Sequence, residues 1–240
     1  MKNILLLLAL FACLNTQAQE RHPINRVSAG ILKTAYATSE MMEGAGVAYK
    51  GWDQLLNVVY NELRETMKPT TFAALRDAQR AWIQFRDAEF QTIQQIYYGE
   101  MEGTMWRPVA VDQRTKIVRQ RAEFLLEQYE LLTMTYERVP KTIKKLWRVT
   151  NLDIEARIDI REDLTSVWYD LEDEEYQVKF YRLTTNCSGD EAAPSSKTIE
   201  FFPMGENEKS QCYFIENLDT KNVQLRAVDS DEVLKMKTRQ

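Results

Sequence analysis

The chain has 240 residues, of which 44% are hydrophobic and 28% charged, with a formal net charge of −5 at pH 7. This composition is ordinary for a folded protein and allows one large domain or two small ones. The acidic balance disfavours nucleic acid as a partner, because such binding needs a basic face.

Enzyme chemistry is also disfavoured by the residue types available. The single histidine, His22, lies in an N-terminal segment that we expect to be mobile, so Ser–His and Cys–His catalytic pairs are excluded unless His22 serves. The glycines are scattered and form no phosphate-binding loop. We therefore expect no enzyme, no cofactor and no metal site.

Residues 1–18 have the pattern of a secretory signal peptide. Lys2 precedes an apolar run from Ile4 to Ala12, and Thr16-Gln17-Ala18 is a small-x-small cleavage pattern before Gln19. The apolar run is too short to cross a membrane, since a spanning helix needs about 20 apolar residues.

A lipoprotein signal that ends before Cys13 is the alternative. Leu10-Phe11-Ala12-Cys13 resembles a lipoprotein box, and lipidation of Cys13 would anchor the protein to a membrane. Phe11 is bulky for that box, so the sequence favours cleavage before Gln19. In both cases we expect an exported protein of the periplasm or the extracellular space, membrane-bound only if it is lipidated.

Residues 19–140 have the apolar spacing of a small antiparallel helix bundle. A short helix is predicted over Ser28–Met42, with Val27, Ile31 and Ala35 inward, and Pro69 separates the next two helices. Gly99–Pro108 is predicted to be a loop. The predicted buried stripes are Trp52, Leu55, Leu56, Val59, Tyr60 and Leu63; then Phe72, Leu75, Ala78, Gln79, Trp82, Phe85, Glu89 and Ile93; then Ile117, Arg121, Phe124, Leu125, Gln128, Leu131 and Leu132.

The stretch LRDAQRAWIQFRDAEF, Leu75–Phe90, places two arginines, a glutamine and a tryptophan at helical spacing after an L-N-x-x-Y-x-x-L frame. This arrangement resembles the N-terminal domain of the lysozyme-inhibitor LprI family over about Trp52–Tyr136. The family usually has cysteine where this chain has Phe90, so the disulfide of that cysteine is absent. The residues that carry the resemblance are Leu56, Asn57, Tyr60, Leu63, Leu75, Ala78, Gln79, Arg80, Trp82, Arg86, Asp87 and Glu89.

The resemblance implies an exported helical domain and, by the family's name, lysozyme inhibition. Physically, we interpret the motif as a polar network that fixes the register of the helices, with Asn57 bonded across to Gln79 or Arg86 and Trp82 burying its ring. The alternative is that Arg80 and Arg86 form an exposed face that binds an anionic partner.

Residues 141–240 have the period-two alternation of β-strands. In Ile154–Ile160, apolar residues are separated by Glu155, Arg157 and Asp159. Seven or so short strands predict an antiparallel barrel or sandwich, loosely lipocalin-like, and hence an α+β protein of two domains. The other expected strands are Leu146–Thr150, Tyr176–Phe180, Thr198–Phe202, Gln211–Glu216, Asn222–Ala227 and Glu232–Lys237.

Cys187 and Cys212 are predicted to form a disulfide, because export places them in an oxidising compartment. Two buried thiols are the alternative. A metal site is a poor interpretation, because two thiols without a nearby histidine are half a zinc site.

A dense acidic run precedes one of the predicted strands. It is interpreted as a solvated turn, with a calcium site or a partner-facing patch as alternatives. Residues 141–240 hold 15 basic and 20 acidic residues, so the β domain carries most of the net charge of −6 that remains without the signal peptide. Such a surface attracts a basic partner, and lysozymes are typically basic. The run consists of Asp170, Glu172, Asp173, Glu174 and Glu175.

Three functions follow from these patterns. The first is an envelope binding protein, in particular a lysozyme inhibitor whose Gly99–Pro108 loop or acidic run occludes the sugar-binding cleft. The second is a small-ligand or lipid-binding β-barrel with a helical interaction module, and the third is a structural envelope protein with neither activity. In the second, the cavity would be lined by Trp147, Trp168, Tyr169, Phe180 and Phe202.

Overall fold

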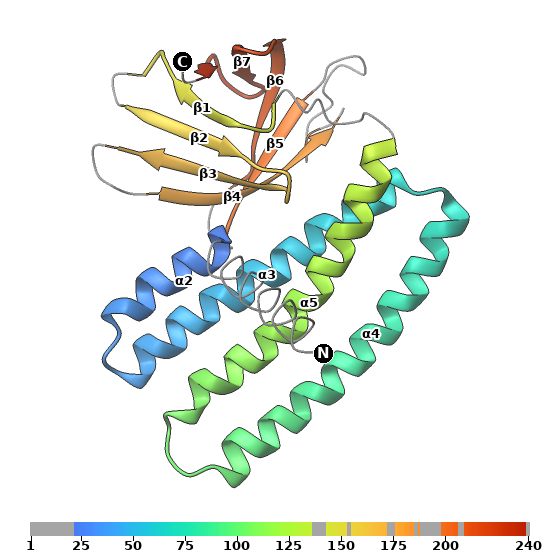
Figure 1. The fold of residues 1–240 in the computed structure, drawn as a ribbon, viewed down its shortest axis with the longest axis vertical. Coiled ribbons are helices and arrows are strands. Elements are labelled where there is room, and N and C mark those ends of the chain that lie inside the picture. The colour runs from blue at the N-terminus through green and yellow to red at the C-terminus, as the bar shows by residue number, and fades with distance from the viewer. Residues whose placement is uncertain are drawn as a thin grey trace, which may run out of the picture.

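The computed structural model describes residues 22–135, 143–152, 155–171, 176–184, 187, 198–205 and 209–238. Within these residues, helices occupy the N-terminal part and an antiparallel barrel the C-terminal part, which confirms the α+β class (Figure 1). The expected signal peptide, Cys13 and the expected domain boundary at residues 140 and 141 lie outside the described residues.

The helical part consists of long helices that run side by side away from the barrel (Figure 1). Proline stands in the first turn of α2 and of α4, where its missing N–H is not needed. Among the described helices, none combines the length and the apolar character that crossing a bilayer requires. The elements are α2 Pro23–Thr34, α3 Thr38–Thr66, α4 Pro69–Gln95, the π-helix η1 Ile96–Glu100 and α5 Trp106–Thr135.

The first predicted helix is wrong in its bounds. Residues 28–42 are divided between α2 and α3, because the carboxylate of Glu40 accepts hydrogen bonds from the N–H groups of Tyr36 and Ala37 and so begins a new helix. Ser28 is buried and donates to the carbonyl of Gly44, where the two helices approach closely. The buried residues of α2 are Pro23, Ile24 and Ser28, and not the predicted Val27, Ile31 and Ala35.

The core of the helical part lies between α3 and α5. The predicted stripe of α3 is confirmed, with Tyr60 half-buried and the rest buried. The predicted stripe of α5 is largely wrong, because Phe124 and Leu131 are 49% and 61% exposed. This helix has apolar residues on two sides, and periodicity alone does not select between them. Its buried side consists of Ala110, Thr115, Val118, Ala122, Leu125 and Tyr129.

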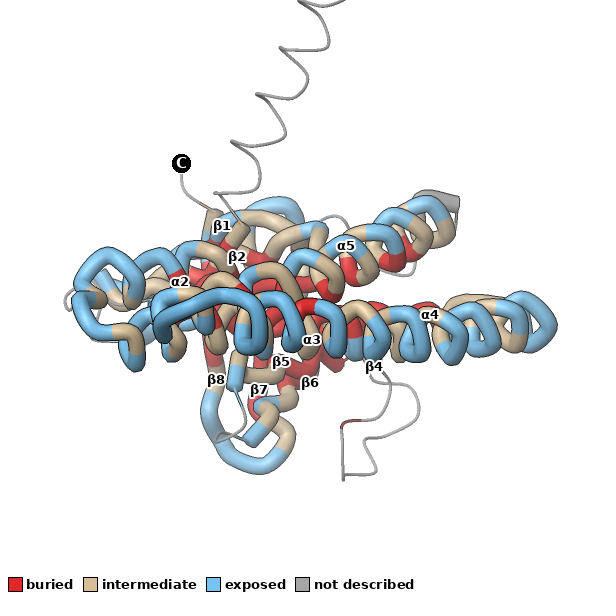
Figure 2. Tube along the Cα trace, turned by 90° about the horizontal axis from the view of Figure 1, so that it is seen from below, coloured by how far each residue is buried: buried red, intermediate tan, exposed pale blue. Residues whose placement is uncertain are grey.

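Helix α4 lies at the edge of the bundle and buries little. Ile93 alone of its residues is buried, while Leu75, Trp82 and Phe90 pack half-buried against the core. Figure 2 shows exposed residues along the outer sides of the helices and buried residues on their inner sides. The predicted loop Gly99–Pro108 is shorter than expected, because the chain is helical up to Glu100 and again from Trp106.

The barrel is closed, with each strand antiparallel to the next and β1 paired with β8. A barrel, rather than a sandwich, is therefore the correct alternative. The sequence analysis missed β3, because TSVWYD does not alternate between apolar and polar residues. Its first three residues are all buried in the structure. The strands are β1 Leu146–Val149, β2 Ala156–Ile160, β3 Thr165–Asp170, β4 Tyr176–Thr184, β5 Thr198–Pro203, β6 Gln211–Leu218, β7 Asn222–Ala227 and β8 Val233–Thr238.

The barrel and the helices share one continuous core. Helices α2 and α3 pack against β4. The side chain of Gln54 donates to the carbonyl of Pro203 and accepts from the N–H of Gly205. The predicted disulfide between Cys187 and Cys212 is confirmed, with 6.1 Å between the Cα atoms.

Candidate functional site

Two turns lie at the end of the helical part that is away from the barrel (Figure 1). One is Leu32–Glu43, where α2 passes into α3, and the other is Ile96–Arg107, where α4 passes into α5. The hydroxyl oxygens of Thr38 and Thr104 are 3.4 Å apart and join the two turns. These two segments are called the distal tip below.

The distal tip is unusually apolar for an exposed surface. Seven of the fifteen exposed large hydrophobic side chains among the described residues lie on it, and Tyr36 and Met105 are 93% and 64% exposed. Apolar groups gathered in this way are typical of a surface that binds another protein. The seven are Leu32, Tyr36, Met41, Ile96, Tyr98, Met101 and Met105.

The charged residues of the distal tip are mainly acidic. Its two segments contain four glutamates against two cations, Lys33 and Arg107. The guanidinium of Arg107 lies 5.9 Å from the ring centre of Tyr98. Hydrogen bonds from the N–H groups of Ala37 and Tyr36 lower the pKa of Glu40, so this side chain remains a carboxylate. The glutamates are Glu40, Glu43, Glu100 and Glu102.

The sequence analysis identified only half of this surface. It proposed the Gly99–Pro108 loop as a binding segment, but it assigned Tyr36 and Met41 to a continuous helix. A sequence signal was present: the large apolar residues Leu32, Tyr36 and Met41 lie close to Glu40, whose carboxylate caps α3. Only the pairing of the two turns in space makes them one surface.

The family motif lies mostly where α4 contacts α5. The side chain of Gln79 accepts a hydrogen bond from the Nε of Arg121, at 2.9 Å. The guanidinium groups of Arg86 and Arg121 lie 5.5 and 5.8 Å from the ring centre of Trp82. The expected bond from Asn57 to Gln79 or Arg86 is not made, because the Asn57 amide donates to the carbonyl of Asp53.

The remaining motif residues are placed around this contact. Tyr60 stacks on Phe72, with ring centres 5.4 Å apart. Arg80 is 69% exposed and pairs with Asp77, whereas Arg86 is 23% exposed and bonds Asp87. Glu89 lies half-buried in a groove between α4 and α5.

The position of the missing family cysteine is filled by packing. Phe90 lies against Tyr49, with ring centres 6.1 Å apart. The guanidinium groups of Arg86 and Arg114 lie 5.7 and 5.4 Å from the Phe90 ring centre. An aromatic contact thus stands where the resemblance would place a disulfide.

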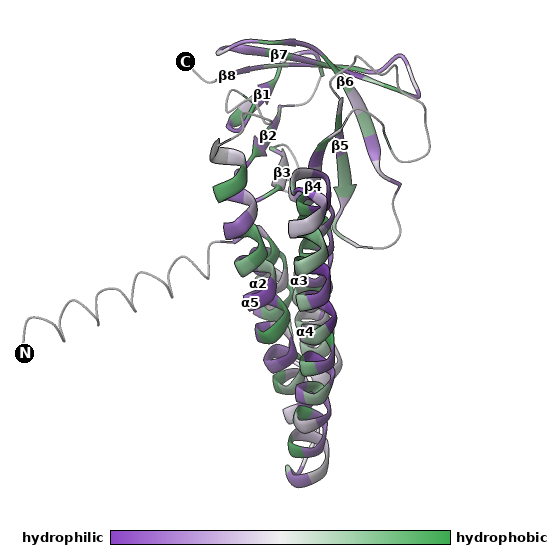
Figure 3. Ribbon diagram, turned by 90° about the vertical axis from the view of Figure 1, so that its right-hand side faces the viewer, coloured by the Kyte–Doolittle hydropathy of each residue, from purple (hydrophilic) through white to green (hydrophobic). Residues whose placement is uncertain are grey.

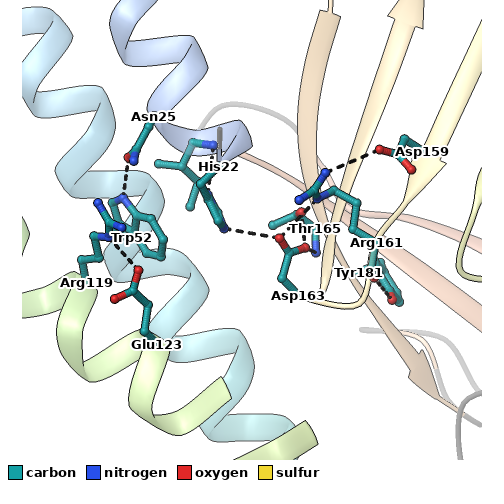
Figure 4. Close-up of polar contacts among 11 residues, drawn as sticks. His22, Asn25, Trp52, Arg119, Glu123, Asp159, Arg161, Asp163, Thr165 and Tyr181 are labelled. Carbon is teal, nitrogen blue, oxygen red and sulfur yellow. Dashed lines mark hydrogen bonds and ion pairs between the residues drawn. The ribbon is translucent and has the colours of Figure 1, made fainter. Parts of the chain in front are cut away.

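A polar cluster joins the helices to the barrel (Figure 4). His22 caps α2, with its Nδ1 accepting from the N–H of Ile24, and its ring lies 4.3 Å from that of Trp52. Its Nε2 faces the carboxylate of Asp163, at 3.5 Å, on the turn between β2 and β3. The expectation that His22 is mobile is therefore wrong.

The protonation of His22 is set by this environment. Burial lowers its pKa from 6.5 to about 4; Asp163 opposes the shift, and Arg161 and Arg119 add to it. The imidazole is therefore neutral at pH 7, and its contact with Asp163 is not an ion pair. Since Nδ1 is an acceptor, the single proton resides on Nε2, which faces the carboxylate.

The barrel interior is filled by side chains. The ring of Phe201 lies 5.1 Å from that of Trp168, 6.4 Å from that of Tyr181 and 6.0 Å from that of Tyr213, measured between centres. Trp147 is fully buried on the same inner face. The other three expected cavity residues, Tyr169, Phe180 and Phe202, lie on the opposite face of their strands by the register.

The acidic run is described only at its first residue. Asp170 ends β3 and is half-buried, while residues 172–175 lie outside the described residues. In the part of the chain that the structure describes, no three histidine, cysteine or acidic side chains gather in a way that would hold a metal ion.

These observations define a two-domain protein in which a helical part with an apolar, acidic tip is joined to a filled β-barrel. Residues 32–125 match the model of the family described as Lysozyme inhibitor LprI, which confirms the resemblance of the helical part. The match includes both segments of the distal tip and ends before the barrel. No curated protein matches the chain, and no solved structure does.

Proposed function

We propose that this chain is an exported protein that binds a lysozyme and inhibits it by inserting the distal tip into the sugar-binding cleft. The exposed apolar surface of the tip is the observation that carries the proposal. The family match supports the kind of partner, and it includes the residues that form the tip.

The shape and chemistry of the tip favour it over the other surfaces. A cleft is blocked by a protrusion, and the tip is the free end of the helical part (Figure 3). Apolar side chains such as Tyr36 and Met105 can act as buried anchors, which supply most of the binding energy at protein interfaces. The surrounding glutamates accelerate encounter with a basic enzyme.

By this mechanism, the inhibitor does not need to contact the catalytic groups of the lysozyme. Glycosidases place two carboxyl groups on either side of the scissile bond, so a protein that fills the cleft excludes substrate from both. We therefore expect inhibition that is competitive with the glycan.

The test is the lysis of a peptidoglycan suspension by c-type and g-type lysozymes, with and without the purified mature protein. Wild-type protein at micromolar concentration should slow lysis in a dose-dependent way. The double variant Tyr36→Ala/Met105→Ala should raise the half-inhibitory concentration at least tenfold, which corresponds to about 1.4 kcal/mol. Leu146→Ala/Leu152→Ala removes exposed apolar groups of the barrel and should have no effect.

The role of charge is tested separately. Glu100→Gln/Glu102→Gln should slow association and flatten its dependence on salt, with a smaller effect on dissociation. Undiminished lysis with wild-type protein in excess would remove the inhibitor proposal. If the tip variants inhibited as strongly as wild-type protein, the tip would be excluded as the binding surface. If neutralising Asp170 and residues 172–175 abolished inhibition, the acidic run would be the binding surface instead.

A further inference from the structure

A groove of about 420 Å³ lies between α4 and α5. Phe85 and Phe124 form its rim and are 55% and 49% exposed. Isolated exposed rings are common, but two exposed rings that line the same groove form a contiguous apolar surface. The lining residues are Trp82, Phe85, Glu89, Ile117, Gln120, Arg121 and Phe124.

A strip of small residues runs beside this rim. Ala74, Ala78 and Ala81 precede Phe85 at intervals of four, three and four residues, so all four lie on one side of α4. The three alanines are exposed. Small alanine side chains therefore lie beside the large aromatic side chains of Phe85 and Phe124. The aromatic side chains of a second copy could pack onto the alanines of the first.

The groove also contains one cation and one anion, Arg121 and Glu89, that do not pair with each other. The Nη2 of Arg121 is buried and has no hydrogen-bond partner among the described residues. Glu89, on the opposite wall, makes no hydrogen bond or ion pair with any described residue. A buried donor without an acceptor is unfavourable, so a carboxylate that reaches Arg121 would stabilise the groove.

We propose that a second copy of this chain covers the groove in a twofold-symmetric dimer. The Phe124 ridge of each protomer would pack on the alanine strip of its partner, and Glu89 of each would reach the other's Arg121. A twofold contact requires a surface that is complementary to itself in shape and in charge. An acidic peptide would satisfy Arg121 but would be repelled by Glu89, and a basic one would leave Arg121 unsatisfied.

The test is sedimentation velocity of the mature protein from low micromolar to several hundred micromolar concentration. Wild-type protein should shift from monomer to dimer over this range. Ala81→Trp fills the strip and should raise the dissociation constant at least tenfold. Ile83→Trp adds the same ring on the other side of α4, because residues two apart on a helix do not face each other, and it should leave the dissociation constant unchanged; Ile83 is 38% exposed. Equal circular dichroism of both variants shows that the fold is retained.

The proposed contact between Glu89 and Arg121 is tested by a second variant and its control. Glu89→Lys should weaken the dimer, while Glu232→Lys, the same change at an exposed position of the barrel directly before β8, should not. Wild-type protein that remains monomeric at the highest concentration overturns the proposal, as does a dimer that Ala81→Trp leaves intact. These measurements need no lysozyme, so their failure is distinct from that of the inhibitor proposal.

Discussion

Acidification should destabilise the fold through His22, the single histidine of the chain. Its ring is 14% exposed and lies between the Trp52 ring and the Asp163 carboxylate, with Arg119 and Arg161 nearby. A proton on Nδ1 would end the cap on the N–H of Ile24 and would place a buried positive charge beside two arginines.

The size of the effect follows from the pKa of His22, which burial lowers from 6.5 to about 4. The unfolded chain therefore takes up the proton more readily than the folded protein. Neutral His22 therefore makes its full contribution to the free energy of unfolding above pH 6.5, and this contribution is lost as the pH falls toward 4. We expect a loss of roughly 1 kcal/mol at about pH 5.5 and at most about 3 kcal/mol below pH 4.

Urea denaturation followed by tryptophan fluorescence at about pH 7.5, 6.5 and 5.5 measures this loss. His22→Asn is the control, because asparagine retains an acceptor at the helix cap but does not titrate. Burial raises the pKa of Asp53 and of Glu130, and these groups act in the opposite direction in both proteins. The difference between the two proteins isolates the histidine, and equal losses would refute the argument.

Two further predictions concern packing and the barrel. Leu125→Ala should lower the free energy of unfolding by about 2–5 kcal/mol, whereas Phe124→Ala should change it by less than about 1 kcal/mol; similar urea midpoints for the two would contradict the observed register of α5. Glu200→Gln should cost about 3–5 kcal/mol, because buried Glu200 accepts from both Nε and Nη2 of Arg182, at 2.9 and 2.7 Å. Partial recovery in Glu200→Gln/Arg182→Met, measured by thermal unfolding, would confirm that the uncompensated arginine carries the cost.

Several features of this protein were determined by local sequence alone. The change from a helical repeat to period-two alternation predicted the order of helices and strands, because neighbours along the chain determine both patterns. The α3 stripe was predicted from regular helical spacing. The disulfide was predicted for a different reason, the oxidising compartment that the expected signal peptide implies. The Leu75–Phe90 motif was enough to indicate the family that residues 32–125 match.

Other features were decided only by tertiary structure. Helix α5 has apolar residues on two sides, and the position of α3 determines that Leu125 is buried while Phe124 is exposed. The distal tip exists because Thr38 and Thr104, 66 positions apart, meet in space. His22 is buried because the turn that carries Asp163 covers it. In each case the sequence specifies which face of an element is apolar, but the element packed against that face decides whether it becomes core or a binding surface.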